Sequence, residues 1–146
     1  MRITINFGVD NILFGMTEAE VICALGQPDK TVVTDYDDRE LYYNQHKLVL
    51  KIEIENNARL GWIEVHNCHA RWSDIDLCNI QRATLLELLS AELGDSYECE
   101  DYGHMESYSF NKHWIELQYE FDELTSFNFG VPYDDNDKPL WPIPRN

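Results

Sequence analysis

Alternating apolar and polar residues predict two long β-strands in the sequence. In residues 47–54 (KLVLKIEI) the apolar side chains fall on every second position, and residues 113–121 (HWIELQYEF) repeat the pattern. A strand of this kind packs its apolar face on a core and leaves the other face free. The expected buried faces are Leu48, Leu50, Ile52 and Ile54, and Ile115, Leu117, Tyr119 and Phe121.

Shorter apolar runs flank both long strands. Turn-forming residues separate them, including Asn56-Asn57 and Asp122-Glu123. Each long strand therefore belongs to an antiparallel meander, with further strands expected at residues 41–44, 60–65, 106–110 and 124–129.

A helix is expected before the first meander. Thr17 and Glu20 have the spacing of a capping box, in which each side chain accepts a bond from a backbone amide of the other residue. Gly26 suits a left-handed C-terminal cap, and Pro28 prevents the helix from continuing. Its expected apolar face is Val21, Ala24 and Leu25.

A second helix is expected before the second meander, with the same start and stop signals. Thr84 and Glu87 repeat the capping-box spacing, and Gly94 follows the last apolar residue. Its expected apolar face is Leu85, Leu88, Leu89 and Leu93.

The two halves also match residue by residue. At one constant offset, Asn44 aligns with Asn111, His46 with His113, Leu50 with Leu117, and Glu53 with Glu120. The sequence therefore predicts an α+β fold in which two tandem repeats, at about 10–65 and 80–130, form one curved sheet with helices on one face. We expect a single domain over residues 1–146, because one repeat alone would be marginally stable. The linker 66–82 is expected to form a strand or short helix, and the acidic tail 132–146 to be irregular, pinned in part by Leu140 and Trp141.

One motif resembles known families. It consists of Gly15, Met16, Thr17, Glu20, Val21, Leu25, Gly26 and Pro28. The pattern resembles the opening of the SmpA/OmlA outer-membrane assembly lipoproteins and of the beta-lactamase inhibitory protein family. The resemblance implies two helix-plus-meander repeats forming a curved sheet whose concave face clamps another protein. No lipidation cysteine stands near the start, which argues against the outer-membrane role.

The charge narrows the class of partner. With 27 acidic and 11 basic side chains, the chain has a formal net charge of −16. Such a field repels nucleic acid and anionic membranes and accelerates encounters with basic proteins. The alternative is that the charge serves solubility alone.

Location is expected to be cytoplasmic. The first residues show no signal-peptide pattern, and no run approaches the roughly 20 apolar residues of a membrane helix. The four cysteines form no CxxC pair and are expected to be free thiols.

Sequence motifs for catalysis are missing. The chain has no Gly-x-Ser-x-Gly elbow, phosphate-binding loop or dinucleotide fingerprint, so we expect neither an enzyme nor a cofactor. A metal site remains an alternative, because zinc favours Cys and His ligands. The candidate ligands are His66, Cys68, His69 and Cys78, although their spacing matches no standard zinc finger and Cys68 could instead belong to the core.

The remaining candidate is a protein-binding surface on the helix-free face of the sheet. Aromatic side chains ringed by charge are typical of binding hot spots. On this face we expect Tyr42, Val49, Lys51, Trp62, Trp114, Glu116 and Gln118. Two acidic loops are expected to overlook it from equivalent places, one with Asp35, Tyr36, Asp37 and Asp38 and one with Glu98, Glu100, Asp101 and Tyr102. The alternative is that these aromatic residues cover sheet surface without a ligand.

The sequence thus favours a protein-binding inhibitor without metal or cofactor. We expect an immunity protein that neutralises a basic toxin, for example a nuclease, by occluding its active site. The alternatives are an unanchored scaffold or interaction module resembling the outer-membrane assembly proteins, and a small zinc-binding protein.

Overall fold

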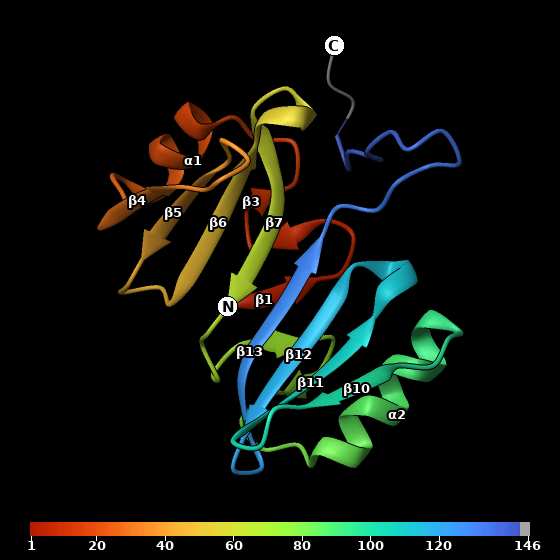
Figure 1. The fold of residues 1–146 in the computed structure, drawn as a ribbon. Helices are drawn as coiled ribbons and strands as arrows, with labels where there is room; N and C mark the ends of the chain where they lie inside the picture. The colour runs from red at the N-terminus through yellow and green to blue at the C-terminus, as the bar shows by residue number, and fades with distance from the viewer. Residues whose placement is uncertain (144–146) are drawn as a thin grey trace.

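An eight-stranded antiparallel sheet organises the molecule (Figure 1). The computed structural model describes residues 1–143. The strand order is β10-β11-β12-β13-β7-β6-β5-β4. Along the chain these strands are β4 (Lys30–Val33), β5 (Arg39–Tyr43), β6 (Leu48–Glu53), β7 (Arg59–Val65), β10 (Glu98–Asp101), β11 (Met105–Phe110), β12 (Ile115–Glu120) and β13 (Glu123–Gly130).

The sheet consists of two four-stranded meanders joined at their last strands. β13 pairs antiparallel with β7, with Phe127 opposite Val65 and Phe129 opposite Ile63. All four of these side chains are buried. Because β7 and β13 run in opposite directions, corresponding turns of the two meanders lie at opposite ends of the sheet.

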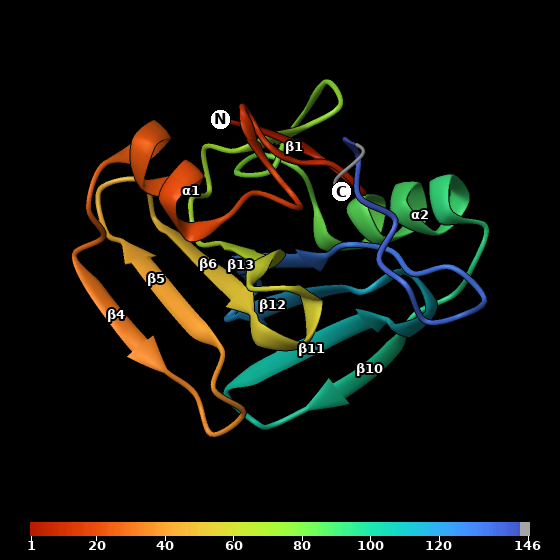
Figure 2. The same ribbon diagram turned by 90° about the horizontal axis from the view of Figure 1, so that it is seen from above.

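Both helices and a smaller sheet cover one face of the large sheet. Figure 2 shows the large sheet as a curve, with α1 (Glu18–Leu25), α2 (Arg82–Leu93) and β1 on the same side. The fold is thus α+β and dominated by strands. The smaller sheet has the order β3-β2-β1-β8-β9. Its strands are β1 (Arg2–Thr4), β2 (Gly8–Val9), β3 (Ile12–Leu13), β8 (Arg71–Trp72) and β9 (Ile75–Asp76).

Helix α1 begins as its sequence indicates. The Thr17 hydroxyl accepts a bond from the Glu20 amide, and the Glu20 carboxylate accepts one from the Thr17 amide, each at 3.2 Å. Val21 is buried, but Ala24 is exposed, so the predicted apolar face is too wide. Gly26 ends the helix with φ 85° and ψ −173°, outside the expected left-handed helical conformation.

The predicted start of α2 is wrong. The helix begins at Arg82 after the N-cap Gln81, so Thr84 lies inside the first turn and forms no cap. A tertiary contact explains the earlier start, because the Arg82 side chain binds Glu106 on β11. Leu88 is 41% exposed, whereas Leu86 is buried beside the expected Leu85 and Leu89. Gly94 does adopt the left-handed cap.

The strand predictions fail mainly at the ends and edges. Ile54 and Phe121, expected on buried faces, are 53% and 88% exposed because β6 and β12 end one residue earlier. Ile54 starts a short 3-10 turn, η1 (Ile54–Asn56), and Phe121 has φ 49° in the β12–β13 turn. The alternation pattern does not predict the edge strands β4 and β10 or the N-terminal strands β1–β3. In the linker 66–82 the expected strand is present as β9, preceded by β8, and Arg82 already belongs to α2.

The C-terminal segment has no helix or regular strand over residues 132–143. Tyr133 forms an isolated β-bridge with Pro139, and the Trp141 ring packs close to Gly15. Residues 144–146 of the expected irregular tail lie outside the described residues. Neither helix in residues 1–143 has the length and apolar character required to span a membrane.

The buried position of Phe129 predicts that its side chain contributes strongly to the stability of the fold. This side chain is fully buried, and its ring lies 5.4 Å from that of Phe14, which follows the smaller sheet. We expect Phe129→Ala to lower the free energy of unfolding by about 3–5 kcal/mol, through lost burial and the cavity left behind. Urea unfolding followed by circular dichroism measures this change. The matched control is Phe121→Ala, at an 88% exposed ring, with an expected effect within about 0.5 kcal/mol. Equal effects of the two substitutions would contradict the assigned packing.

Candidate functional site

The face of the large sheet opposite the helices carries a row of side chains that crosses all eight strands. We call this surface the open face. Strand pairing places each member of the row directly opposite the next. In order the row is Lys30, Tyr42, Val49, Glu64, Asn128, Glu116, Ser109 and Glu98.

Glu116 is the centre of a polar network on this face. Its carboxylate accepts hydrogen bonds from Gln118 Nε2 at 2.9 Å, Asn128 Nδ2 at 3.2 Å and Ser107 Oγ at 3.2 Å. Asn128 and Ser107 are only 3% and 5% exposed. The floor of the open face near its middle is therefore polar, buried and ordered by hydrogen bonds.

Two polar atoms of this floor lack a hydrogen-bond partner among residues 1–143. They are Asn128 Oδ1 and Ser126 Oγ, both buried. Buried polar groups are nearly always hydrogen-bonded, and an unmade bond costs about 1–3 kcal/mol. Unpaired polar atoms of this kind favour a partner that supplies hydrogen-bond donors over a partner with an apolar surface.

A cavity of about 590 Å³ lies at one end of the sheet, and we call it the acidic cavity. The turns after β4, β6 and β11 converge there with the C-terminal segment. The lining residues are Tyr36, Asp38, Glu53, Glu55, Asn56, Trp114, Tyr133 and Asp137. Four are acidic and three aromatic, and none of these lining residues is basic.

The aromatic wall of the acidic cavity is held by defined contacts. The rings of Trp114 and Tyr133 lie 5.4 Å apart, and Asn56 Nδ2 donates to the Tyr133 hydroxyl at 2.8 Å. Trp114 was expected within a strand, but it precedes β12 in a left-handed conformation with φ 56°. The Gly130 amide donates to its carbonyl at 2.8 Å and ties this backbone to the sheet.

Glu53 is the partly buried carboxylate of the acidic cavity. Burial raises the pKa of its carboxyl, opposed by a hydrogen bond from Asn56. Gly61 makes room for this side chain, since a Cβ there would lie 1.6 Å from Glu53 Oε1. The cavity therefore holds a carboxylate that a bound cation would stabilise.

The first predicted acidic loop reaches this cavity. Residues Asp35 to Asp38 form the β4–β5 turn, in which Thr34 Oγ1 accepts bonds from the amides of Tyr36 and Asp38. Asp38 Oδ1 also accepts a bond from the Ile54 amide at 2.9 Å. Tyr36, 83% exposed, stands at the entrance, whereas Asp35 and Asp37 do not line the cavity.

Three further residues predicted for the binding surface, Tyr42, Lys51 and Trp62, lie on the open face. Lys51 is directly opposite Trp62, and the Tyr42 ring centre lies 4.5 Å from Nζ of Lys30. The Trp62 indole packs on Gly130, where a Cβ would approach it to 2.9 Å.

The second predicted acidic loop is mostly a strand. Glu98 and Asp101 are the first and last residues of edge strand β10, and only Tyr102 lies in the following turn. Side chains alternate along a strand, so Glu98 and Glu100 share the open face while Asp101 points to the opposite face. The Tyr102 turn lies at the end of the sheet opposite the Asp35–Asp38 turn, because β7 and β13 are antiparallel. Glu98, at the start of β10, lies at the other end and accepts a bond from Asn111 Nδ2 of the β11–β12 turn at 3.1 Å.

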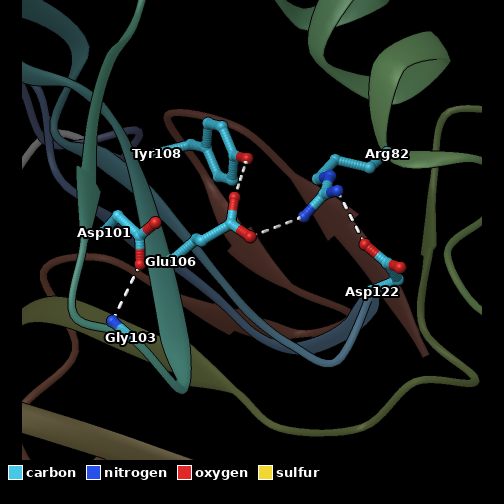
Figure 3. Close-up of polar contacts among 6 residues, drawn as sticks. All are labelled: Arg82, Asp101, Gly103, Glu106, Tyr108 and Asp122. Carbon is cyan, nitrogen blue, oxygen red and sulfur yellow. Dashed lines mark hydrogen bonds and ion pairs between the residues drawn. The ribbon is translucent and has the colours of Figure 1, made fainter.

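A charged cluster that the sequence did not reveal lies on the helix-covered side (Figure 3). Arg82 contacts Glu106 at 3.2 Å and Asp122 at 2.7 Å, and the Tyr108 hydroxyl donates to Glu106. In the same view Asp101 accepts a bond from the Gly103 amide. The guanidinium lies 5.5 Å from the Tyr119 ring centre, so we interpret the cluster as the anchor of α2 on the sheet.

The predicted metal ligands gather only in part. One ligand atom from each of Cys68, His69 and Cys78 lies within 4.8 Å of the others. His66 instead contacts Glu64 at 3.1 Å. Cys68 is exposed, so the alternative that it belongs to the core is wrong.

Comparisons with known proteins give little further information. No protein-family model matches the chain, and no curated protein matches it. Among solved structures, the chain is similar to the 1.5 Å crystal structure of an extracellular protein containing a SCP domain from Bacillus anthracis str. Ames, with 12% identity and a TM-score of 0.49. The match covers 90% of this chain and 50% of that one, so the chain spans about half the length of that neighbour. A likeness this weak supports no argument about function.

The raised pKa of Glu53 predicts a pH-dependent effect on stability. A carboxyl with a raised pKa favours the folded state below its ordinary value of 4.5 and loses that contribution as pH rises through the folded-state value. Glu53→Gln should therefore raise the melting temperature at pH 7 relative to wild type, and the gain should vanish below pH 4.5. Differential scanning calorimetry across this pH range checks the trend. The control Glu55→Gln removes a charge from an exposed position of the same cavity. An equal gain from both variants would show that general charge reduction, rather than burial of Glu53, is responsible.

Proposed function

We propose that this protein is an inhibitor that binds a basic protein, an immunity protein acting in the cytoplasm against a toxin such as a nuclease. The observation that carries the proposal is the acidic cavity beside the open face, which combines four carboxylates with three aromatic rings. Inhibition would be steric and electrostatic, through occlusion of the toxin's active site.

The cavity suits an arginine or lysine side chain of the partner. A guanidinium can stack on the Trp114 and Tyr133 rings while the carboxylates of Asp38 and Glu53 accept its hydrogen bonds. Charge-assisted bonds to a partly buried carboxylate are stronger than those at an open surface. Tryptophan, tyrosine and arginine are also the residue types enriched at the hot spots of protein interfaces.

The open face supplies a second contact area. It carries Glu64, Glu98, Glu100 and Glu116 against Lys30 and Lys51, and Tyr42 and Trp62 provide apolar area between the charges. The formal net charge of −16 would steer a basic partner towards either surface.

We also propose that the two helix-plus-meander units are tandem copies of one unit. Both meanders have a β-bulge at matching places, after Lys51 and after Gln118. Lys47 and Trp114, which also match, both have a left-handed backbone just before the long strand. Duplication would explain an open face wide enough to cover an active site.

Affinity capture tests the proposed function. The full-length chain is used as bait in lysate of its native host, washed at low and then moderate salt. We expect one basic protein retained near 1:1, which is then produced separately for titration and activity assays. Trp114→Ala should weaken its binding by about 2 kcal/mol, roughly thirtyfold, as for an interface hot spot. Wild-type protein should abolish the partner's toxic activity, and the variant should do so only at higher concentration.

Matched charge reversals provide the control. Asp38→Lys changes the acidic cavity, whereas Glu87→Lys makes the same change at an exposed position on α2, on the opposite side of the sheet. Only the first should weaken binding. An equal loss of binding affinity in both variants would show that net charge alone drives the interaction. A bound partner that keeps its full activity would refute inhibition.

A further inference from the structure

We infer that Cys68, His69 and Cys78 form a binding site for a thiophilic divalent metal ion, with zinc as the expected ion. The site lies apart from the acidic cavity and is independent of the proposed inhibitor function. It uses two thiols and one imidazole, the ligand types that zinc prefers in proteins.

The distances are close to those of a tetrahedral site. His69 Nδ1 is 3.9 Å from Cys78 Sγ, and the three ligand atoms all lie within 4.8 Å of one another. With Zn–S bonds of about 2.3 Å and Zn–N bonds of about 2.0 Å, tetrahedral ligand atoms are separated by roughly 3.5–3.8 Å. Small side-chain rotations would therefore bring all three atoms onto one ion.

The backbone holds these ligands in place. β8 and β9 form a hairpin in which Arg71 is opposite Asp76, and the Leu77 amide continues the ladder by donating to the Ala70 carbonyl at 3.2 Å. The next residues beyond that contact are His69 and Cys78. They are thus brought together by the hairpin across a sequence gap that resembles no standard zinc motif.

Two side-chain bonds fix the turns that carry the ligands. Asn67 Oδ1 accepts a bond from the His69 amide at 3.0 Å, and Asp76 Oδ1 accepts one from the Cys78 amide at 3.1 Å. The ligand backbones are therefore ordered before any ion binds, which reduces the entropy that binding must overcome.

The surroundings leave space for a fourth ligand. Cys68 and Cys78 line a cavity of about 230 Å³ together with the acidic residues Asp122 and Glu123. A water molecule can complete the coordination there, giving three protein ligands and one open position. The carboxylate of Glu123 adds a negative field that favours a divalent cation, whereas Asp122 is paired with Arg82.

Cobalt substitution tests the site on the full-length protein, reduced and stripped of metal under anaerobic conditions. We expect Co²⁺ to bind at one equivalent per chain, with a thiolate-to-cobalt charge-transfer band and the intense visible absorption of tetrahedral cobalt. Zn²⁺ should displace it one for one. Cys78→Ser should remove most of the charge-transfer intensity and weaken zinc binding by more than about 100-fold, beyond the usual effect of an outer-shell change.

Variants of the other cysteines are the controls. Cys23→Ser and Cys99→Ser also remove exposed free thiols, and both should bind cobalt as wild type does. Circular dichroism confirms that each variant is folded. The inference is overturned if the reduced protein gives no charge-transfer band, or if the band persists in a Cys68→Ser/Cys78→Ser double variant. It is also overturned if oxidation joins Cys68 to Cys78 while the reduced form binds no metal. None of these outcomes bears on partner binding, which Cys78→Ser should leave unchanged.

Discussion

The pairing of β7 with β13 is the contact on which the rest of the structure depends. Each four-stranded meander alone would leave a long apolar strand at an exposed edge, which favours aggregation. Pairing these two strands removes both edges and buries Ile63, Val65, Phe127 and Phe129 in one core. The remaining edges are β4 and β10, and β10 is exposed throughout and mostly acidic, which discourages further strand addition.

The same pairing decides where the chemistry of the surface lies. Its antiparallel sense brings the β6–β7 and β11–β12 turns to one end of the sheet, where Glu53 and Trp114 line the acidic cavity. It also aligns Glu64 with Asn128 and Glu116 in one row of the open face. Acidic groups that are distant in sequence therefore face one surface, and the proposed function rests on this arrangement more than on the net charge.

Local signals predicted those parts of the fold that local contacts determine. The Thr17 capping box and the alternating strands around Leu50 and Leu117 follow from neighbouring residues, and the structure has them. The start of α2 was missed because the contact of Arg82 with Glu106 joins residues distant in sequence. The sequence predicts a loop where β10 lies, because four exposed, mostly acidic residues carry no apolar alternation, yet pairing with β11 makes them a strand.

In the candidate sites too, the sequence identifies single residues, whereas only the fold shows which of them lie together. Tyr36, Asp38 and Trp114 were identified from their residue types, but no sequence pattern connects them with Tyr133 or Glu53. Only the glycine at 61 marks the place where Glu53 lies against the sheet. Among the cysteines, Cys68 and Cys78 come together with His69 through the β8–β9 hairpin, whereas His66 contacts Glu64.

Native-state hydrogen exchange of the backbone amides in β6, β7, β12 and β13 tests most directly whether the two meanders form one cooperative sheet. If the β7–β13 pairing unites them, the slowest amides of all four strands should exchange with a single opening free energy, equal to that of global unfolding. If the amides of β6 and β7 open at a distinctly lower free energy than those of β12 and β13, the halves unfold independently. The continuous sheet, and with it the arrangement of the open face and the acidic cavity, would then be contradicted.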